Sequence, residues 1–371
     1  MSISKEAVKE ALGNVIEPDL KKDIVELNLV ESIEVEGQTI KLVVQVSNPA
    51  MHSRKRMEEA CEFAIHRVLG DEWTVETEVK ALDKEGKSAD TRKVLPGVKN
   101  IIAVASGKGG VGKSTVAANL AAGLAKKGHS VGLIDADIYG PSMPMMFDLV
   151  YEKPKTIEKE GKQYIEPLEN YGVKMLSIGF FADPTEAIVW RGPMASKALN
   201  QMFTDAWWGP LDYMIVDLPP GTGDIHLSLV QVVPLTGAVI VSTPQEVALA
   251  DAKKGVSMFR LDSINVPVVG LIENMSYFSS PDGSGEKHYL FGKEGVRNLA
   301  EDTNVPFLGE VPIIQSIREA GDVGRPAVLQ ENTSSAQVFD QIIDNFEKEV
   351  KNRNENQDPT KAVKVSMQYP K

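Results

Sequence analysis

The sequence predicts an α/β protein in which a small α+β domain precedes a doubly wound, mostly parallel β-sheet. Two observations lead to this fold class. From about residue 96 onward, short and almost continuously apolar runs alternate with segments of helical periodicity, which is typical of a parallel sheet covered by helices on both faces. A glycine-rich loop joins the first of these runs to a helix, whereas residues 1–80 combine helices with strands of alternating polarity.

The elements are expected in the following order. Within residues 1–80, helices are predicted near 6–12 and 57–69, and strands near 29–35, 39–46 and 74–79. In the larger part, buried strands are predicted at Ile101–Ala105, Val131–Ile134, Tyr213–Asp217, Gly237–Ser242, Pro267–Ile272 and Pro306–Gly309. A last helix has an apolar stripe from Val338 to Val350 and an acidic opposite face, so we expect it to cap the sheet rather than bind a membrane.

Length and composition set the domain organisation. The chain of 371 residues is long enough for two domains. We expect the small α+β domain at 1–80, a polar linker at 81–95, the sheet domain at 96–351 and a disordered, polar tail at 352–371.

The formal net charge of −12 argues against non-specific binding to nucleic acid. No apolar run is long enough to span a bilayer, and the N-terminus lacks the apolar core of a signal peptide, so we expect a cytoplasmic protein. The single cysteine, Cys61, excludes an intrachain disulfide, and its place on an apolar helix face favours a buried, inert thiol.

The glycine-rich loop has the chemistry of a phosphate-binding loop. Residues Gly107 to Ser114 fit the pattern G-x-x-x-x-G-K-[ST] between a strand and a helix. Glycines let backbone N–H groups approach a triphosphate, and the new helix adds the positive end of its dipole. Lys113 is expected to reach the β- and γ-phosphates and Ser114 to ligate Mg²⁺. The predicted nucleotide contacts are Gly107, Lys108, Gly109, Gly110, Val111, Gly112, Lys113, Ser114 and Thr115; the alternative is a glycine-rich turn without a ligand.

Polar side chains follow three of the predicted strands, at the sheet edge where ligands bind in open α/β sheets. Asp217 ends an apolar strand, as a Walker B carboxylate beside Mg²⁺ would. Asp135 and Asp137 follow another strand, and Asp135 is expected near the groups that ligate the metal ion. Asn274 offers a donor and an acceptor suited to an adenine edge. The alternative is a solvated turn for the aspartates and, for Asn274, a side chain that only hydrogen-bonds to the backbone of a turn.

The run Lys108–Lys113 resembles the deviant Walker A loop of the MinD/ParA and Mrp/ApbC ATPases. In that group the first lysine reaches across a dimer interface to the partner's nucleotide, and Asp137 resembles the aspartate that positions the attacking water. The resemblance therefore implies a homodimeric, Mg-dependent ATPase with Lys108, Lys113 and Asp137 as catalytic residues. A solvated loop lysine is the alternative for Lys108.

Further motifs resemble the Mrp/ApbC family of ATP-dependent iron–sulfur cluster carriers. They are Trp190–Met194, Asp217–Asp224, Thr243–Gln245 and Glu273–Ser276, in the family's order. Residues 18–27 and 48–51 resemble the small domain of iron–sulfur assembly proteins. The resemblance implies ATP and Mg as cofactors, a bound iron–sulfur cluster, and scaffold or recipient proteins as partners.

The sequence departs from that family at the cluster ligands. Members carry a Cys-x-x-Cys pair shortly after the Asn-Met-Ser motif, where this chain has Ser280 and no second thiol. Met51 replaces a cysteine that many of the small domains carry. Asp282 and His288 could contribute ligands, but the sequence around them favours a solvated loop. Three functions stay open: a cluster carrier, a cluster-free adaptor ATPase, and a MinD/ParA-like positioning ATPase, which the acidic charge and the C-terminal helix disfavour.

Overall fold

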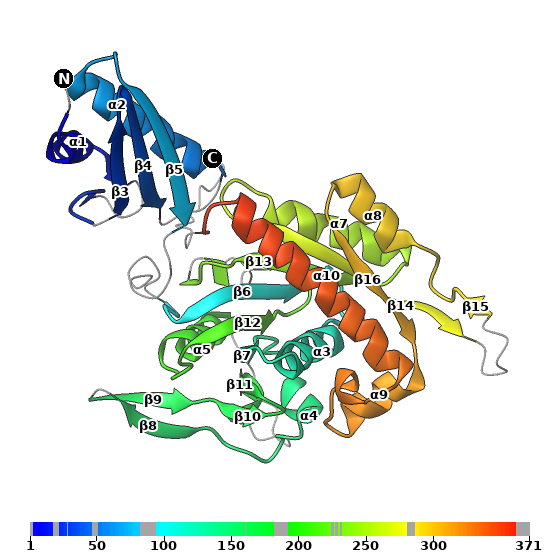
Figure 1. Cartoon of the computed structure of the whole chain (residues 1–371). Coiled ribbons are helices and arrows are strands. Elements are labelled where there is room, and N and C mark those ends of the chain that lie inside the picture. The colour runs from blue at the N-terminus through cyan, green and yellow to red at the C-terminus, as the bar shows by residue number, and fades with distance from the viewer. Residues whose placement is uncertain are drawn as a thin grey trace, which may run out of the picture. The chain divides into compact units, whose positions relative to one another are not determined.

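The computed structural model describes residues 3–17, 22–27, 29–46, 51–81, 94–159, 161–181, 192–223, 226, 229–230, 232–279 and 286–360. The chain forms two compact units (Figure 1): the described residues up to 81 together with 351–359 form a small unit, and those of 94–350 together with Thr360 form a large one. The expected linker lies almost wholly outside the described residues, as do Trp190, Arg191, Asp224, Ser280 and Asp282.

The small unit folds around one helix and a three-stranded sheet. Its elements are α1 (Lys5–Leu12), β1 (Ile16–Glu17), β2 (Lys22–Asp23), β3 (Val30–Glu36), β4 (Thr39–Val46), α2 (Met51–Leu69) and β5 (Thr74–Ala81). Strand β3 pairs antiparallel with β4, and β5 pairs parallel with β4 because α2 makes the crossover. The core contains Leu12, Ile24, Ile40, Leu42 and Ile65, all buried.

The helices and the three longer strands of this unit confirm the predicted elements. Their alternating or helical apolar pattern is a strong signal. The short pair β1 and β2 was not predicted, since two residues carry no periodicity. Cys61 is buried in the core, and burial raises the pKa of its thiol to about 12, so the expectation of a buried thiol is confirmed.

The large unit is built on a nine-stranded sheet in the order β10-β11-β7-β12-β6-β13-β14-β15, with β16 also paired to β14. The strands are β6 (Val98–Ala105), β7 (Val131–Asp135), β10 (Leu168–Asn170), β11 (Val173–Ser177), β12 (Leu211–Asp217), β13 (Gly237–Ser242), β14 (Val268–Ser279), β15 (Lys287–His288) and β16 (Phe307–Ile313). Among the described strands of this sheet, only the pairs β10–β11 and β14–β15 are antiparallel. The predicted α/β class with a mostly parallel sheet is confirmed.

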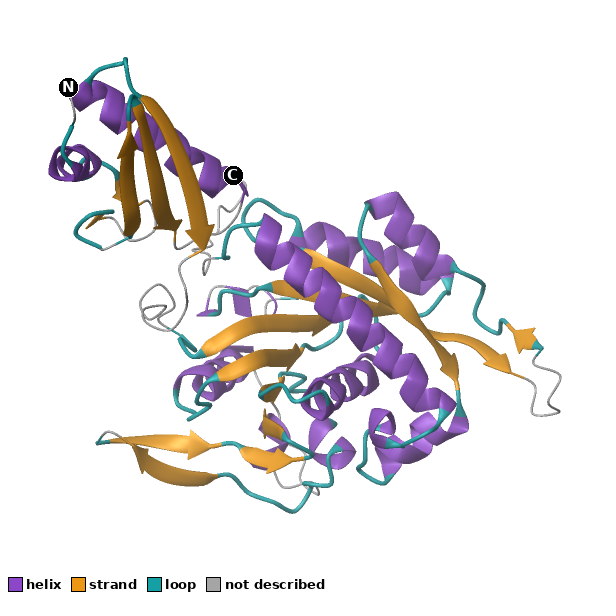
Figure 2. Cartoon of the chain, in the orientation of Figure 1, coloured by secondary structure: helices purple, strands orange, loops and turns teal. Residues whose placement is uncertain are grey.

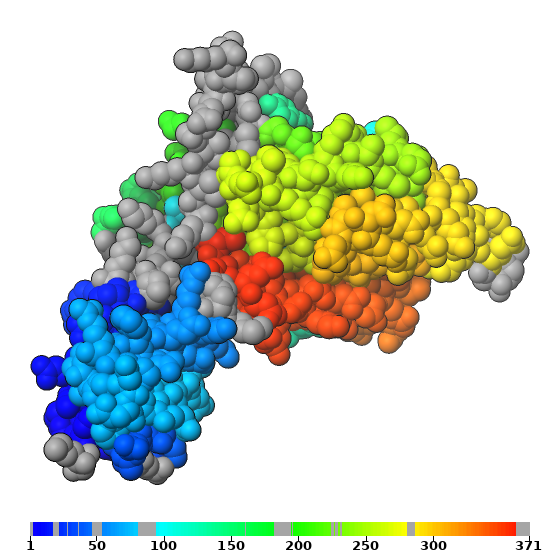
Figure 3. Space-filling view, turned by 90° about the horizontal axis from the view of Figure 1, so that it is seen from above, coloured from blue at the N-terminus to red at the C-terminus, as the bar shows by residue number. Residues whose placement is uncertain are grey.

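Helices cover both faces of this sheet (Figure 2), and each face has its own apolar core. One core contains residues of α3 (Lys113–Lys126), α4 (Met143–Met146), α9 (Gln315–Asp322), η2 (Ala327–Leu329) and α10 (Ser334–Asn356). The other contains residues of α5 (Gly192–Thr204), α7 (Glu246–Phe259) and α8 (Gly295–Thr303). Figure 3 shows α7 in yellow-green beside α8 in amber. The sheet is therefore doubly wound.

Three further elements complete the unit. A hairpin of β8 (Lys155–Lys159) and β9 (Lys162–Glu166) lies outside the main sheet, and the 3-10 turn η1 (Ile178–Phe181) follows β11. Strands β8, β9, β10 and β11 were not predicted, because polar and charged residues interrupt their apolar pattern, and η1 is too short to show a helical period. Among the described helices, none combines the length and the hydrophobicity that crossing a bilayer would require.

The last helix corrects one predicted boundary. We expected a disordered tail to begin at 352, but α10 continues to Asn356. Arg353 is buried there, and its guanidinium donates a hydrogen bond to the carbonyl of Asp358 at 2.7 Å. The polar composition of this segment therefore did not indicate that its residues form a helix and hydrogen bonds. Residues 361–371 lie outside the described residues.

Candidate nucleotide site

The glycine-rich loop joins β6 to α3 at the carboxyl edge of the sheet, as predicted. Gly110 and Gly112 have φ angles of 81° and 80°, in the left-handed region that favours glycine. A side chain at Gly112 would place its Cβ 2.2 Å from the Asn274 amide nitrogen, and one at Gly107 would lie 2.2 Å from the backbone of Asp251. Other residues therefore cannot replace these glycines without moving the loop.

Three side chains meet where this loop, α3 and the end of β12 come together. The Lys113 ammonium donates hydrogen bonds to Asp217 Oδ1 at 2.6 Å and to Ser114 Oγ at 3.3 Å. The Ser114 hydroxyl donates to Asp217 Oδ2, also at 2.6 Å. Lys113 and Asp217 are 5% and 0% exposed, so water screens their attraction little. Burial raises the pKa of Asp217, and the Lys113 charge opposes that rise.

This donor set fits a magnesium–triphosphate group. A carboxylate and a hydroxyl are the hard oxygen ligands that Mg²⁺ prefers, and here they lie within hydrogen-bond distance of each other. The Lys113 ammonium beside them is a cation of the kind that neutralises β- and γ-phosphates. The loop before α3 presents backbone N–H groups at the positive end of that helix. The residues predicted for phosphate and metal are thus brought together in one place.

Asp137 lies beside this cluster. One of its carboxylate oxygens, Oδ2, is 3.7 Å from the Lys113 ammonium, and its side chain is 13% exposed. The carboxylate is therefore held near the Lys113 ammonium and still reaches solvent. This is the arrangement that a residue orienting a water molecule requires.

Asp135 shapes the loop that carries Asp137. Its Oδ1 accepts a hydrogen bond from the backbone N–H of Asp137 at 3.2 Å, and its Oδ2 accepts one from the Ser177 hydroxyl at 2.9 Å and one from the backbone N–H of Ser142 at 3.2 Å. Burial, and then the neighbouring charge of Asp217, raise the pKa of Asp135 to about 7. The carboxylate thus anchors the loop between β7 and α4. Ser177 was not predicted, since only the pairing of β11 with β7 brings it here.

Asn274 lies under the glycine-rich loop. It is 7% exposed, and its amide nitrogen donates to the carbonyl of Val111 at 2.8 Å. Next to it, Met275 has a φ of 55° inside β14, where the register with β16 shifts. Asn274 therefore supports the loop directly, a role that the sequence did not indicate.

The other predicted loop residues are more open. Lys108 is exposed, and no described residue forms an ion pair with its ammonium group. Its backbone carbonyl accepts a hydrogen bond from the Ser106 hydroxyl at 3.0 Å, which fixes the loop but leaves the side chain outward. Thr115 is half-buried, and its carbonyl accepts a hydrogen bond from the Asn119 amide.

The loop after Asp217 lies against the glycine-rich loop. The backbone N–H of Gly221 donates to the carbonyl of Ser106 at 2.8 Å. His226, just beyond, was not singled out by the sequence: it is 2% exposed, and neither ring nitrogen has a hydrogen-bond partner among the described residues. Burial lowers the pKa of this imidazole to about 4, so the ring is neutral at pH 7.

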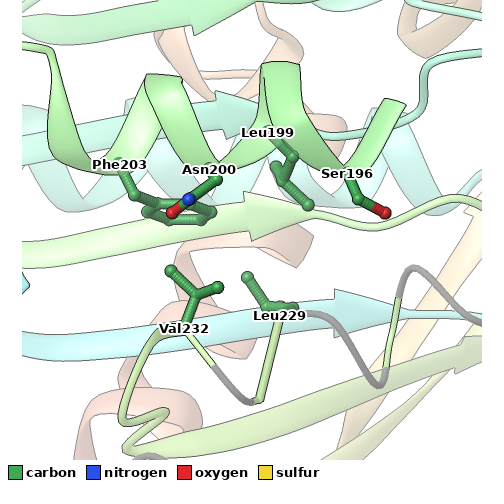
Figure 4. A pocket seen from close by; sticks show the side chains of 6 residues that line it. All are labelled: Ser196, Leu199, Asn200, Phe203, Leu229 and Val232. Atoms are coloured by element: carbon green, nitrogen blue, oxygen red, sulfur yellow. The ribbon is translucent and has the colours of Figure 1, made fainter. Parts of the chain in front are cut away.

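A small cavity of about 10 Å³ lies away from this site (Figure 4). Four side chains of α5 point toward Leu229 and Val232 across it, and the lining is Ser196, Leu199, Asn200, Phe203, Leu229 and Val232. This volume holds about one water molecule at most. The cavity is therefore a packing gap within the apolar core rather than a ligand site.

Of the residues named as possible cluster ligands, the structure describes His288 alone. His288 lies in β15 and is exposed, while Ser280 and Asp282 fall outside the described residues. No three described His, Cys, Asp or Glu side chains gather in a way that would hold a metal ion.

Comparison with known proteins identifies the family. The family described as NUBPL iron-transfer P-loop NTPase matches residues 97–347, more than half of the chain. The chain belongs to this family. A second family, described as iron–sulfur cluster assembly protein, matches residues 5–77. The resemblance drawn from the motifs, for both parts of the chain, is thereby confirmed.

Individual relatives of this NUBPL-type chain agree with that assignment. An iron–sulfur cluster carrier protein of Synechocystis is 44% identical over 334 residues, which cover 90% of this chain and 94% of the relative. The iron–sulfur cluster transfer protein NUBPL of Dictyostelium discoideum is 50% identical over 272 residues, 72% of this chain and 82% of the relative. A nucleotide-binding protein of Archaeoglobus fulgidus, solved with ADP, is 38% identical with a TM-score of 0.56 and covers 65% of this chain and 91% of its own.

Proposed function

We propose that this chain is a Mg-dependent ATPase that works as a homodimer and delivers iron–sulfur clusters to recipient proteins. The observation that carries the ATPase part is the buried contact of Lys113, Ser114 and Asp217 beneath the glycine-rich loop. Membership of an NTPase family supports it. Mg²⁺, held by Ser114 and Asp217, would neutralise charge on the phosphates.

The chain's own residues divide the remaining tasks. Lys113 exchanges its present bond with Asp217 for phosphate oxygens, which keeps its charge paired inside the site. Asp137 orients the attacking water, and Asp135 holds the backbone from which Asp137 projects. Asn274 fixes the loop through Val111, so its carboxamide oxygen is the group that would accept a hydrogen bond from adenine.

The dimer is supported by Lys108. This cation sits at the loop that binds phosphate but points to solvent, with no ion pair to any described residue. A lysine in this position serves catalysis best if it reaches the nucleotide of a second copy, where a trans-acting cation stabilises the transferring phosphoryl group.

Replacing Asp137 tests the ATPase. Asp137→Ala should bind Mg-ATP with nearly unchanged affinity but lose most hydrolysis, because water positioning contributes only on the way to the transition state. Calorimetric titration measures the first quantity and phosphate release the second. Asp262→Ala, an exposed aspartate outside the site, is the matched control. Hydrolysis at the unaltered rate in Asp137→Ala would remove this residue from the role.

The proposal that this chain delivers iron–sulfur clusters is supported by its relatives, which are named as carrier and transfer proteins of such clusters. One observation favours a second candidate, a cluster-free adaptor ATPase: the only cysteine of the chain is buried, and burial raises the pKa of its thiol to about 12. Such a thiol is a poor iron ligand, because the thiolate is the form that binds.

Anaerobic reconstitution with iron and sulfide separates the two candidates. A carrier acquires visible absorption and a fixed iron content per dimer, and then passes both to an apoprotein. The Cys61→Ala chain is the control for ligation by the buried thiol. A chain that remains colourless while it hydrolyses ATP is an adaptor, and the carrier proposal is then wrong.

A further inference from the structure

A groove of about 270 Å³ lies on the small unit, between the α1–β1 turn and one face of α2. Its lining consists of Asn14, Val15, Ile16, Ala60, Phe63, Ala64 and Arg67. Val15 and Ala64 are buried at its floor, whereas Ile16 and Phe63 are 56% and 68% exposed. Two large apolar side chains thus remain in water at the edges of one depression. Such a grouping is typical of a surface that binds another molecule.

The groove carries a positive charge without a partner. Arg67 is its one charged lining residue, and no described residue forms an ion pair or hydrogen bond with the guanidinium. Arg56 precedes it on the same face of α2, because positions 56, 60, 63 and 67 recur at helical spacing. Arg56 also has no such partner in the described part of the chain. These cations flank Phe63 on a chain whose formal net charge is −12.

We propose that this groove binds a short segment of a partner protein, with an apolar side chain as its anchor and aspartate or glutamate residues beside it. The volume is below the usual range of about 300–1,000 Å³ for small-molecule sites, so it suits an anchoring side chain better than a whole cofactor. The unpaired arginines select acidic neighbours on that segment. The chain's own residues 361–371 carry three lysines and no acidic residue, so they do not match.

This inference does not depend on the ATPase. The groove belongs to the small unit, and none of its residues takes part in the nucleotide site. Groove variants should therefore hydrolyse ATP as the unaltered chain does. A failure of the groove proposal leaves the ATPase proposal standing, and the reverse also holds.

Selection of displayed peptides on the full-length chain tests the groove. A library of short random peptides is panned against the chain, and an enriched sequence is then synthesised with a fluorescent label. Its affinity is measured by anisotropy for the unaltered chain, Phe63→Ala and Arg67→Glu. The matched controls are Val68→Ala, an exposed apolar residue of α2 outside the groove, and Arg54→Glu on the opposite side of that helix.

The enriched peptides should contain one apolar anchor with acidic neighbours. Phe63→Ala should weaken binding by about tenfold or more, as the loss of an anchor residue does. Arg67→Glu should weaken it most at low salt, and both controls should bind as the unaltered chain does. Because Phe63 and Arg67 are exposed, neither change should alter the unfolding transition.

Three outcomes would overturn the proposal. The first is a selection that enriches no peptide, or only basic ones. The second is an enriched peptide that binds Phe63→Ala and Arg67→Glu as it binds the unaltered chain. The third is a change of molecular mass in solution for Phe63→Ala while no peptide binds, which would assign the groove to a second copy of this chain.

Discussion

At the scale of single residues, the nucleotide site consists of contacts between side chains that are distant in the sequence. Lys113 and Asp217 are 104 residues apart, and Asn274 is 163 residues from Val111. Each contact is buried, so each polar atom must find a partner there. The glycine-rich loop therefore forms this site only when the ends of three strands bring their polar residues to the same edge of the sheet.

Replacing Lys113 tests the cation of the site. Lys113→Ala should weaken Mg-ATP binding by roughly tenfold to a hundredfold, because charged hydrogen bonds to the phosphates are lost and Asp217 loses its buried partner. Calorimetric titration measures this loss, with Lys159→Ala on the exposed β8 strand as the control. Unchanged affinity in Lys113→Ala would contradict the assignment of this loop.

The sequence predicts this site in part. Gly107 to Ser114 and Asp217 are evident from a local motif and from the end of an apolar strand, and the structure places them together. The support that Ser177 gives to Asp135, and Asn274 to Val111, depends on strand order, which no local pattern encodes. His226 carries no spacing signal either, and only its burial reveals it.

At the scale of elements, charged clamps hold the helix and strands that carry the site. The acidic face of α10 pairs with the end of α3: Asp340 pairs with Lys126 at 3.1 Å, and Asp344 and Glu347 both pair with Lys127. Helix α3 begins at the glycine-rich loop, so these pairs link the opposite end of the same helix to α10.

A second clamp joins the first residues of the central strands. Asp212 in β12 accepts hydrogen bonds from the Lys99 ammonium in β6 at 2.7 Å and from the backbone N–H of Ser130, before β7, at 2.9 Å. The Lys99 bond, followed by that of Ser130, lowers the pKa of Asp212 to about 2. The ionised carboxylate is thus favoured in the folded state.

Asp212→Asn should therefore lower the free energy of unfolding at pH 7. The pKa shift alone corresponds to roughly 2 kcal/mol, and we expect about 1 kcal/mol, because the Lys99 side chain is largely exposed to solvent. Since the folded pKa lies below the unfolded value of 3.8, this contribution is present above pH 4 and lost as pH falls toward 2.

Denaturant unfolding of Asp212→Asn and the unaltered chain, at pH 7 and pH 3, measures the difference at both values. Asp262→Asn, an exposed aspartate, serves as control. A difference of the same size at both pH values would show that the carboxylate charge does not stabilise the strands.

Element-level prediction succeeded where apolar periodicity is unbroken. The runs around β6, β7, β12, β13 and β14 are almost wholly buried, and their sequence shows it. Strands β8 and β9 expose most of their residues, so their composition resembles that of loops, and Lys174 interrupts the short apolar run of β11. The extension of α10 to Asn356 was missed for the same reason, because its last turn is polar.

At the scale of the whole molecule, a nucleotide site shared by two chains would couple ATP turnover to the contact between them. Lys108 is the residue that would link ATP turnover to that contact, because it lies on the glycine-rich loop but turns its cation outward. A symmetric dimer would then contain two such sites, each using one lysine from the other chain.

Lys108→Ala tests this link, and by our account it should bind ATP nearly normally while hydrolysis falls roughly a thousandfold or more. The most direct measurement mixes Lys108→Ala with Asp137→Ala. In a mixed dimer, the phosphate loop of the Lys108→Ala chain keeps its own Asp137 and receives an intact Lys108 from the other chain. The second site lacks both groups.

Phosphate release is measured from equimolar mixtures of the two variants, at concentrations where dimers exchange. It shows whether Lys108 acts across the dimer. The account predicts recovery of about a quarter of the unaltered activity, because half of the randomly assembled dimers are mixed and each has one working site. If each variant alone binds ATP and dimerises, and the mixture is still no more active than the two variants measured separately, then Lys108 does not act across a dimer and the account is contradicted.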